Sequence, residues 1–176
     1  MSDAEYLGLR AKVDAFAAEV AARSDLTCQS GCSGCCQVQL EVCDVEANAL
    51  RQAIQALPPE RREALAERDS SSACALLDAD GRCEVYEARP LVCRTQGLPL
   101  RYPANTVPVD AVMGRAGDAD VTWCPLNFTL RKPKSADVLD AERVDVMLAL
   151  VNRRAAGESL ALRRRSIREV VAEATR

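Results

Sequence analysis

The chain contains no histidine among its 176 residues. Without an imidazole it has no Ser-His-Asp or Cys-His catalytic machinery, which excludes those classes of hydrolase. It also lacks the histidine ligands of catalytic zinc sites and of zinc fingers with two cysteines and two histidines. Any metal site in this protein must therefore be built from thiolates, with carboxylates as a secondary source of ligands.

Aromatic residues make up 3% of the chain, although hydrophobic residues make up 48%. The core must therefore consist mainly of Ala, Leu and Val, which bury less apolar area per residue than aromatic rings do. Such a fold benefits from a second source of stability, and a bound metal is one. The length of 176 residues is that of one domain, so we expect a single domain over residues 1–176.

Basic stripes and long apolar runs are also missing, and we expect no leader sequence. The net charge is -3 and basic residues do not alternate with aromatic ones, which argues against nucleic-acid binding. No window of about 18 apolar residues occurs, so we expect no membrane span. Residues 1–9 contain two acids and no apolar stretch. We therefore expect a cytoplasmic protein whose thiols stay reduced.

The most informative residues that the chain does contain are its nine cysteines. Buried structural thiols explain one or two scattered cysteines, but four lie within residues 28–36 in the spacing C-x3-C-x2-C-C. Gly31 and Gly34 let this loop turn tightly, and gaps of two and three residues are typical of thiolate-ligated clusters and zinc knuckles. The loop is therefore predicted to bind metal through Cys28, Cys32, Cys35 and Cys36.

Cys35 and Cys36 are adjacent in the chain. Because the side chains of neighbouring residues diverge, these two thiols do not fit comfortably into one small tetrahedral site. Three roles stay open for one of them: a ligand to a second metal, a ligand to a second iron of a cluster, or a redox or catalytic thiol.

A second group of cysteines lies within residues 74–124. Residues 74–86 have the pattern of a β-hairpin whose turn is Asp80-Gly81. Arg89-Pro90 begins a helix or turn, since proline is favoured at the first helical position, and this places the next cysteine one turn in. The candidate ligands of this group are Cys74, Cys83, Cys93 and Cys124.

The eight cysteines of the two groups allow two four-thiolate sites, or one cluster accompanied by structural thiols. Thiolates suit iron–sulfur clusters and zinc alike, so both metals stay open, with iron–sulfur preferred. Cys43 lies outside both groups and beside an expected helix start at Asp44. We interpret Cys43 as a core residue.

Helical periodicity dominates the segments on both sides of the cysteines. We predict a mainly α protein with a small β-hairpin, in which an irregular cysteine-rich metal-binding core at about residues 28–124 is flanked by helices. Residues 98–121 should be irregular, because they contain prolines and turn-prone glycines. The expected helices lie at residues 2–24, 44–56 and 60–68 and within residues 137–175.

The sequence CEVYEARPLVCR at residues 83–94 resembles the C-x-[IV]-Y-E-x-R-P-x-x-C-R signature of the YkgJ-type cysteine-cluster family. That family is described as a zinc- or iron-chelating domain with a CxxCxxCC core. The corresponding core here is residues 28–36, whose first gap has three residues instead of two. The resemblance covers about residues 28–124 and implies a metal-binding domain.

Arg89 and Arg94 of this signature have two compatible interpretations. Their guanidinium groups would offset the negative charge of a thiolate site and donate hydrogen bonds to sulfur. Alternatively, they pair with Glu84 or Glu87 and brace the hairpin.

Four functions follow from these observations. The preferred one is an iron–sulfur protein for electron transfer, sensing or chemistry linked to S-adenosylmethionine. The others are a non-catalytic zinc protein with one or two four-thiolate sites, a metal-handling protein, and a protein methylase. The last is implied by resemblance to flagellin lysine N-methylases, distant relatives described as using an iron–sulfur cluster with S-adenosylmethionine, and no glycine-rich nucleotide loop supports it. Whether the protein is an enzyme stays open, and the expected partner is the metal ion or cluster.

Overall fold

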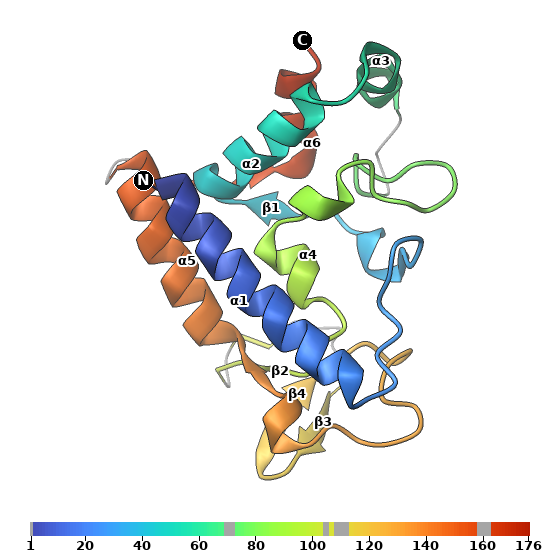
Figure 1. Cartoon of the computed structure of the whole chain (residues 1–176), viewed down its shortest axis with the longest axis vertical. Helices are drawn as coiled ribbons and strands as arrows, with labels where there is room; N and C mark the ends of the chain where they lie inside the picture. Colours follow the sequence, from blue (N-terminus) through green and yellow to red (C-terminus); the bar gives the residue numbers. More distant parts are fainter. Residues whose placement is uncertain (1, 69–72, 104–105, 108–112, 158–162) are drawn as a thin grey trace.

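The structure, a computed structural model, describes residues 2–68, 73–103, 106–107, 113–157 and 163–176. Helices dominate its regular structure and the strands are short (Figure 1). The predicted mainly α fold with a small β part is therefore confirmed. Within these ranges no helix combines the length and the apolar character needed to cross a bilayer.

The two longest helices lie side by side and run in opposite directions (Figure 1). An ion pair between Arg154 and Glu5, at 2.7 Å, joins the end of one to the start of the other. Shorter helices pack around this pair. The α-helices of the described residues are α1 (Ser2–Ala22), α2 (Asp44–Gln55), α3 (Pro59–Glu67), α4 (Leu91–Thr95), α5 (Ala141–Ala156) and α6 (Ile167–Ala174), and the 3-10 turns are η1 (Gly34–Cys36), η2 (Tyr86–Ala88) and η3 (Ser135–Asp137).

Two small sheets accompany the helices. In one, β1 (Glu41–Val42) pairs antiparallel with β6 (Arg165–Ser166) and so joins the start of α2 to the start of α6. The other has the order β3-β4-β2-β5, in which β2 and β5 are parallel and the remaining pairs antiparallel. Its strands are β2 (Leu100–Arg101), β3 (Met113–Ala116), β4 (Ala119–Thr122) and β5 (Leu139–Asp140).

The hairpin of β3 and β4 corrects the prediction that residues 98–121 are irregular. Met113 lies opposite Thr122 and Ala116 opposite Ala119, with Gly117 at a φ of 62° in the turn between them. A glycine at this backbone conformation closes a two-residue hairpin loop without steric cost. Glycine here joins two paired strands and does not interrupt them.

The predicted hairpin at residues 74–86 takes a more compact form. One antiparallel bridge joins Leu77 to Cys83, and Glu84 donates its N–H to the carbonyl of Leu76 at 2.9 Å. The turn at Asp80-Gly81 is confirmed, with Gly81 at a φ of 75° and its N–H bonded to the carbonyl of Asp78. The segment is therefore a tight antiparallel turn whose arms are too short to form strands.

Helix α2 begins at Asp44, as expected, with Cys43 as its N-cap. The two later helices begin after the residues expected from the sequence. The helix expected from residue 137 begins at Ala141, because residues 139–140 pair with β2 and Asp140 caps the first turn by accepting from Arg143 N–H at 3.0 Å. The last helix, expected at residues 160–175, begins at residue 167, and residues 160–162 of its expected span lie outside the described residues.

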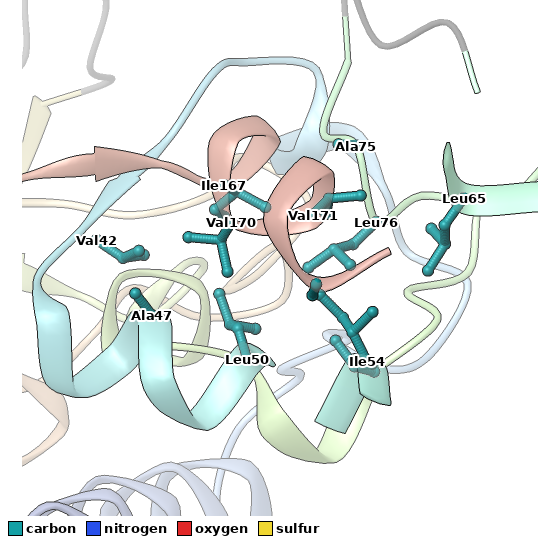
Figure 2. Close-up of a cluster of buried hydrophobic side chains, with 12 residues drawn as sticks. Val42, Ala47, Leu50, Ile54, Leu65, Ala75, Leu76, Ile167, Val170 and Val171 are labelled. Carbon is teal, nitrogen blue, oxygen red and sulfur yellow. The ribbon is translucent and has the colours of Figure 1, made fainter. Parts of the chain in front are cut away.

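One aliphatic cluster joins α2 and the C-terminal helix α6 to the cysteine-rich segment. Figure 2 shows Leu50 and Ile54 of α2 against Val170 and Val171 of α6, with Leu76 of the 74–86 turn completing the cluster. Because the turn contributes to this cluster, the cysteines at its ends are held by the same side chains that anchor the C-terminal helix.

Candidate metal centre

Six of the eight predicted ligands line one cavity of about 50 Å³. They come from three separate segments: the 28–36 loop, the 74–86 turn and α4. Leu40, Leu76 and Ile167 add apolar lining. The six residues are Cys32, Cys35, Cys36, Cys74, Cys83 and Cys93.

Backbone hydrogen bonds hold the three segments in place. Cys74 donates its N–H to the carbonyl of Cys36 at 2.8 Å and so joins the loop to the turn. The bridge to Leu77 fixes Cys83 on the opposite arm. Cys93 follows Pro90 and donates its N–H to the Pro90 carbonyl at 3.0 Å, which places its side chain in the first turn of α4. That position agrees with the prediction from Arg89-Pro90.

The thiols of Cys35 and Cys36 lie close enough to influence each other's ionisation, while the expectation that they do not share one small tetrahedral site stays a prediction. The Cys35 thiol donates a hydrogen bond to the Cys36 sulfur. This bond is the main reason that the pKa of Cys35 is raised and the pKa of Cys36 is lowered from the ordinary thiol value. Cys36 is therefore the more acidic of the two thiols and the one that loses its proton first.

Burial raises the pKa of the deeper thiols. It is the largest influence on Cys74, Cys83 and Cys93, and it raises the pKa of Cys93 to about 12. The charges of neighbouring thiolates act in the same direction on each of them. Crowded thiols of this kind are hard to ionise alone, and a bound cation removes that penalty by displacing the protons.

Arg89 supplies positive charge at the cavity. Its guanidinium group lies 3.5 Å from the centroid of the Tyr86 ring, and both side chains line the cavity. Its charge lowers the pKa of Cys83 and Cys93 against the larger effect of burial. This geometry fits the interpretation that Arg89 offsets thiolate charge.

Arg94 and Glu84 have different partners from those predicted. Arg94 donates hydrogen bonds to both carboxylate oxygens of Asp14 in α1, at 2.6 and 2.7 Å, and so fixes α4 against that helix. Glu84 pairs with Arg61 and with Arg68, the latter at 2.9 Å. Arg94 reaches Glu87 only at its backbone carbonyl, so the predicted bracing of the turn by Arg89 or Arg94 through these glutamates is wrong.

Cys28 and Cys124 lie outside the cavity lining, next to each other. Both face Gly97, where an added Cβ would collide with the Cys28 sulfur and lie 3.8 Å from the Cys124 Cβ. Asn127, which is 1% exposed, donates its side-chain N–H to the Cys28 sulfur at 3.2 Å and to the Gly97 carbonyl at 2.9 Å. The same side chain accepts the Thr27 N–H at 2.9 Å.

Asn127 was missed by the sequence analysis. Its N–H bonds to the carbonyl of Cys124 at 2.9 Å, so it sits in the turn that begins at that cysteine. A polar residue in a turn directly after a candidate ligand was a signal that could have found it, because such residues commonly orient ligands.

Cys43 is 3% exposed and belongs to the hydrophobic cluster of α1, α2 and α5, as interpreted from the sequence. Its thiol lies 3.5 Å from Oε2 of Glu46, and burial raises its pKa to about 12. It is absent from the lining of the thiol cavity.

The donor set suits a soft metal or cluster, because it consists of thiols with one guanidinium group beside them. As the side chains stand, no three Cys, Asp or Glu residues in the described part of the chain are placed to hold a metal ion. Binding would therefore require the sulfurs to move closer together. The assignment of the eight cysteines as ligands stays a prediction.

Residues 27–109 match the model of the CxxCxxCC family, described as "Putative zinc- or iron-chelating domain". The match includes all three segments that line the thiol cavity and agrees with the resemblance of residues 83–94, whereas Cys124 lies beyond its end. Neither a curated protein nor a solved structure matches the chain. The segment that lines the thiol cavity is therefore similar to a family of zinc- or iron-chelating domains, and this similarity supports a cysteine-rich, metal-binding protein.

Proposed function

We propose that this protein holds an iron–sulfur cluster through thiolates of the cavity. The observation that carries the proposal is that six thiols from three segments line one cavity. A structural zinc site is completed by four thiolates, and the cavity offers more. In an iron–sulfur cluster the thiolates bind different irons, with inorganic sulfide between them, so the ligands spread over a larger volume.

The surrounding charges support the same proposal. A cluster held by four thiolates is an anionic assembly, and its potential and stability depend on nearby positive charge and on hydrogen bonds to sulfur. Arg89 lines the cavity and is held over Tyr86. Its role would be to offset thiolate charge, and replacing it with Gln should make the metal easier to lose without removing a ligand.

Elemental analysis of protein purified without oxygen tests the proposal. We expect brown protein with broad visible sulfur-to-iron absorption and with iron and acid-labile sulfide in equal amounts. Cys83→Ser should lose iron, because serine is a poor ligand for it, while Cys43→Ser should keep it. Colourless protein that contains stoichiometric zinc and neither iron nor sulfide contradicts the proposal.

A non-catalytic zinc protein is the second candidate. The observation that favours it is the direct backbone link between Cys36 and Cys74, which holds these two residues next to each other independently of any cluster. Zinc at such thiols would add folding free energy to an aromatic-poor core. We further propose that the protein works as a single domain in the cytoplasm, where reduced thiols persist. The ion pair from Arg94 to Asp14 supports one folding unit, because it joins the α1 flank to the cysteine segment.

A further inference from the structure

We propose that Asn127 is a positioning residue of the metal centre, which holds the Cys28 sulfur beside the thiol cavity so that Cys28 serves as a metal ligand. This inference rests on the proposed metal binding, but it holds for iron–sulfur and zinc alike. Asn127 lies beyond the segment that matches the family of chelating domains. The inference therefore gives the turn after Cys124 a part in the metal centre.

The hydrogen bonds of the Asn127 amide determine which of its atoms faces the sulfur. Its Oδ1 accepts the N–H and the hydroxyl of Thr27, both at 2.9 Å. Its Nδ2 donates to the Gly97 carbonyl at 2.9 Å and to the Cys28 sulfur at 3.2 Å. Because a backbone N–H only donates and a carbonyl only accepts, exchanging the two amide atoms would break both backbone bonds. The sulfur therefore faces an N–H donor.

An N–H donor is suited to a metal-bound thiolate. A thiolate that binds a metal carries no proton and still accepts hydrogen bonds, and such bonds orient it. The Asn127 side chain is shielded from water, since the residue is 1% exposed, and both its nitrogen and its oxygen have protein partners. A buried amide whose bonds are all made has no reason to rotate, so it fixes the place of the sulfur.

Gly97 provides the space in which the sulfur and the amide meet. A Cβ at this position would collide with the Cys28 sulfur and would lie 2.7 Å from Nδ2 of Asn127. The preceding residue, Gln96, lines the thiol cavity, and its carbonyl oxygen lies 3.7 Å from the Cys28 sulfur. Asn127 therefore holds this sulfur against a residue of the cavity wall, where it can join the other thiols when they close on a metal.

Asn127→Asp tests this role, because aspartate has nearly the same shape but cannot donate a hydrogen bond as a carboxylate. It keeps an oxygen for Thr27 and loses the N–H that faces the Cys28 sulfur. Changes in residues that orient ligands lower metal affinity by about 10–100-fold, and we expect a decrease of this size for zinc. The measurement is a zinc titration against a competing chelator, made without oxygen and under reducing conditions.

Asn152→Asp is the matched control. Asn152 is 0% exposed, and its Oδ1 accepts the N–H of Val45 at 3.0 Å, between α5 and α2. This variant also buries a new carboxylate, so it reproduces any general loss of stability, but it should keep the zinc affinity of the wild type. Equal zinc affinities of Asn127→Asp and Asn152→Asp overturn the positioning role.

A second measurement uses the wild-type chain and so does not depend on the folding of a variant. The ¹⁵N-labelled protein is loaded with Cd²⁺, a diamagnetic ion that thiolates bind, and the side-chain amide signals are compared before and after loading. The N–H signals of Asn127 should shift, because the charge on the Cys28 sulfur changes when it binds the metal. Those of Asn152 should stay in place. Bound Cd²⁺ without a shift at Asn127 overturns the inference.

The failure of this inference and the failure of the proposed function are distinguishable. Protein that contains zinc and neither iron nor sulfide contradicts the iron–sulfur proposal, and a lower zinc affinity of Asn127→Asp still supports the role of Asn127. In iron-loaded protein the reduction potential of Asn127→Asp should be more negative, because hydrogen bonds to sulfur and nearby charge set the potential. An unchanged iron content and potential overturn the role of Asn127 and leave the iron–sulfur proposal intact.

Discussion

Glu46 is a buried carboxylate that holds the starts of two helices together. Its side chain is 1% exposed, and Oε1 accepts the N–H of Leu91, the first residue of α4, at 2.9 Å. Oε2 accepts the N–H of Cys43, the N-cap of α2, at 3.2 Å. Because α4 also carries Cys93, this one side chain connects the aliphatic core to the thiol cavity.

Replacing Glu46 with alanine should destabilise the protein by about 2–4 kcal/mol. Each buried N–H that loses its acceptor costs about 1–3 kcal/mol. The loss is partly offset, since the protein no longer has to bury a carboxylate. In a chain of this length 1 kcal/mol corresponds to roughly 2–4 °C in melting temperature, so the decrease should be about 4–16 °C.

The pH dependence gives a second test of the same residue. Burial raises the pKa of Glu46 above its usual 4.5, against the opposing hydrogen bonds from Leu91 and Cys43. A group whose pKa is raised by folding contributes stability below its unfolded pKa and loses that contribution as the pH rises through its folded pKa. Glu46→Gln keeps one oxygen acceptor and does not ionise. Its stability should therefore decline less than that of the wild type as the pH rises above 4.5.

Urea unfolding followed by circular dichroism measures both effects, with the metal content of each sample determined in parallel. Glu142→Ala is the matched control, because Glu142 is an exposed glutamate in the first turn of α5. Surface changes of this kind usually alter stability by less than about 0.5 kcal/mol. If Glu46→Ala unfolds with the same free energy as Glu142→Ala, the capping role assigned to Glu46 is refuted.

Two further predictions concern Asp137 and Gly97. Hydrogen bonds from Arg131, the Lys134 N–H and Arg23 outweigh burial and lower the pKa of Asp137 to about 2, so its contribution to stability should be lost as the pH falls from 3.8 towards 2. In Asp137→Ala the free energy of unfolding should therefore change less over this pH range, as measured by unfolding at several pH values. An unchanged pH dependence would disprove the contribution of Asp137. Gly97→Ala should lower the metal content per chain, because the added Cβ would collide with the Cys28 sulfur. Gly157→Ala is the control: Gly157 has a similar φ of 82° but open space around it, so the change should cost only about 1–3 kcal/mol of backbone strain. Equal metal content in the two glycine variants would contradict this.

Local features of the site could be predicted from the sequence, because short-range chemistry determines them. The Asp80-Gly81 turn requires a positive φ that glycine adopts freely, and Gly81 has it. Arg89-Pro90 fixes the start of α4 and hence the place of Cys93 in its first turn. In each case the determining residues lie within a few positions of the cysteine they place.

The contact that positions Cys28 could not be predicted in the same way. The contact between Asn127 and Cys28 spans 99 residues, and periodicity and spacing carry no information about such pairs. The β3–β4 hairpin was missed for another reason. The turn-prone glycines of residues 98–121 favoured an irregular segment, although a glycine–acid pair such as Gly117-Asp118 between two short strands is itself a hairpin signal.

The C-terminal part of the chain completes a site whose family match ends at residue 109. Ile167, the first residue of α6, lines the thiol cavity and also packs in the core cluster with Leu76. The cysteine segment has little regular structure, so its ordering entropy must be offset by packing and by metal binding together. Since Leu76 and Ile167 serve both the core and the cavity, loss of metal and loosening of α6 should occur together in this protein (Figure 2).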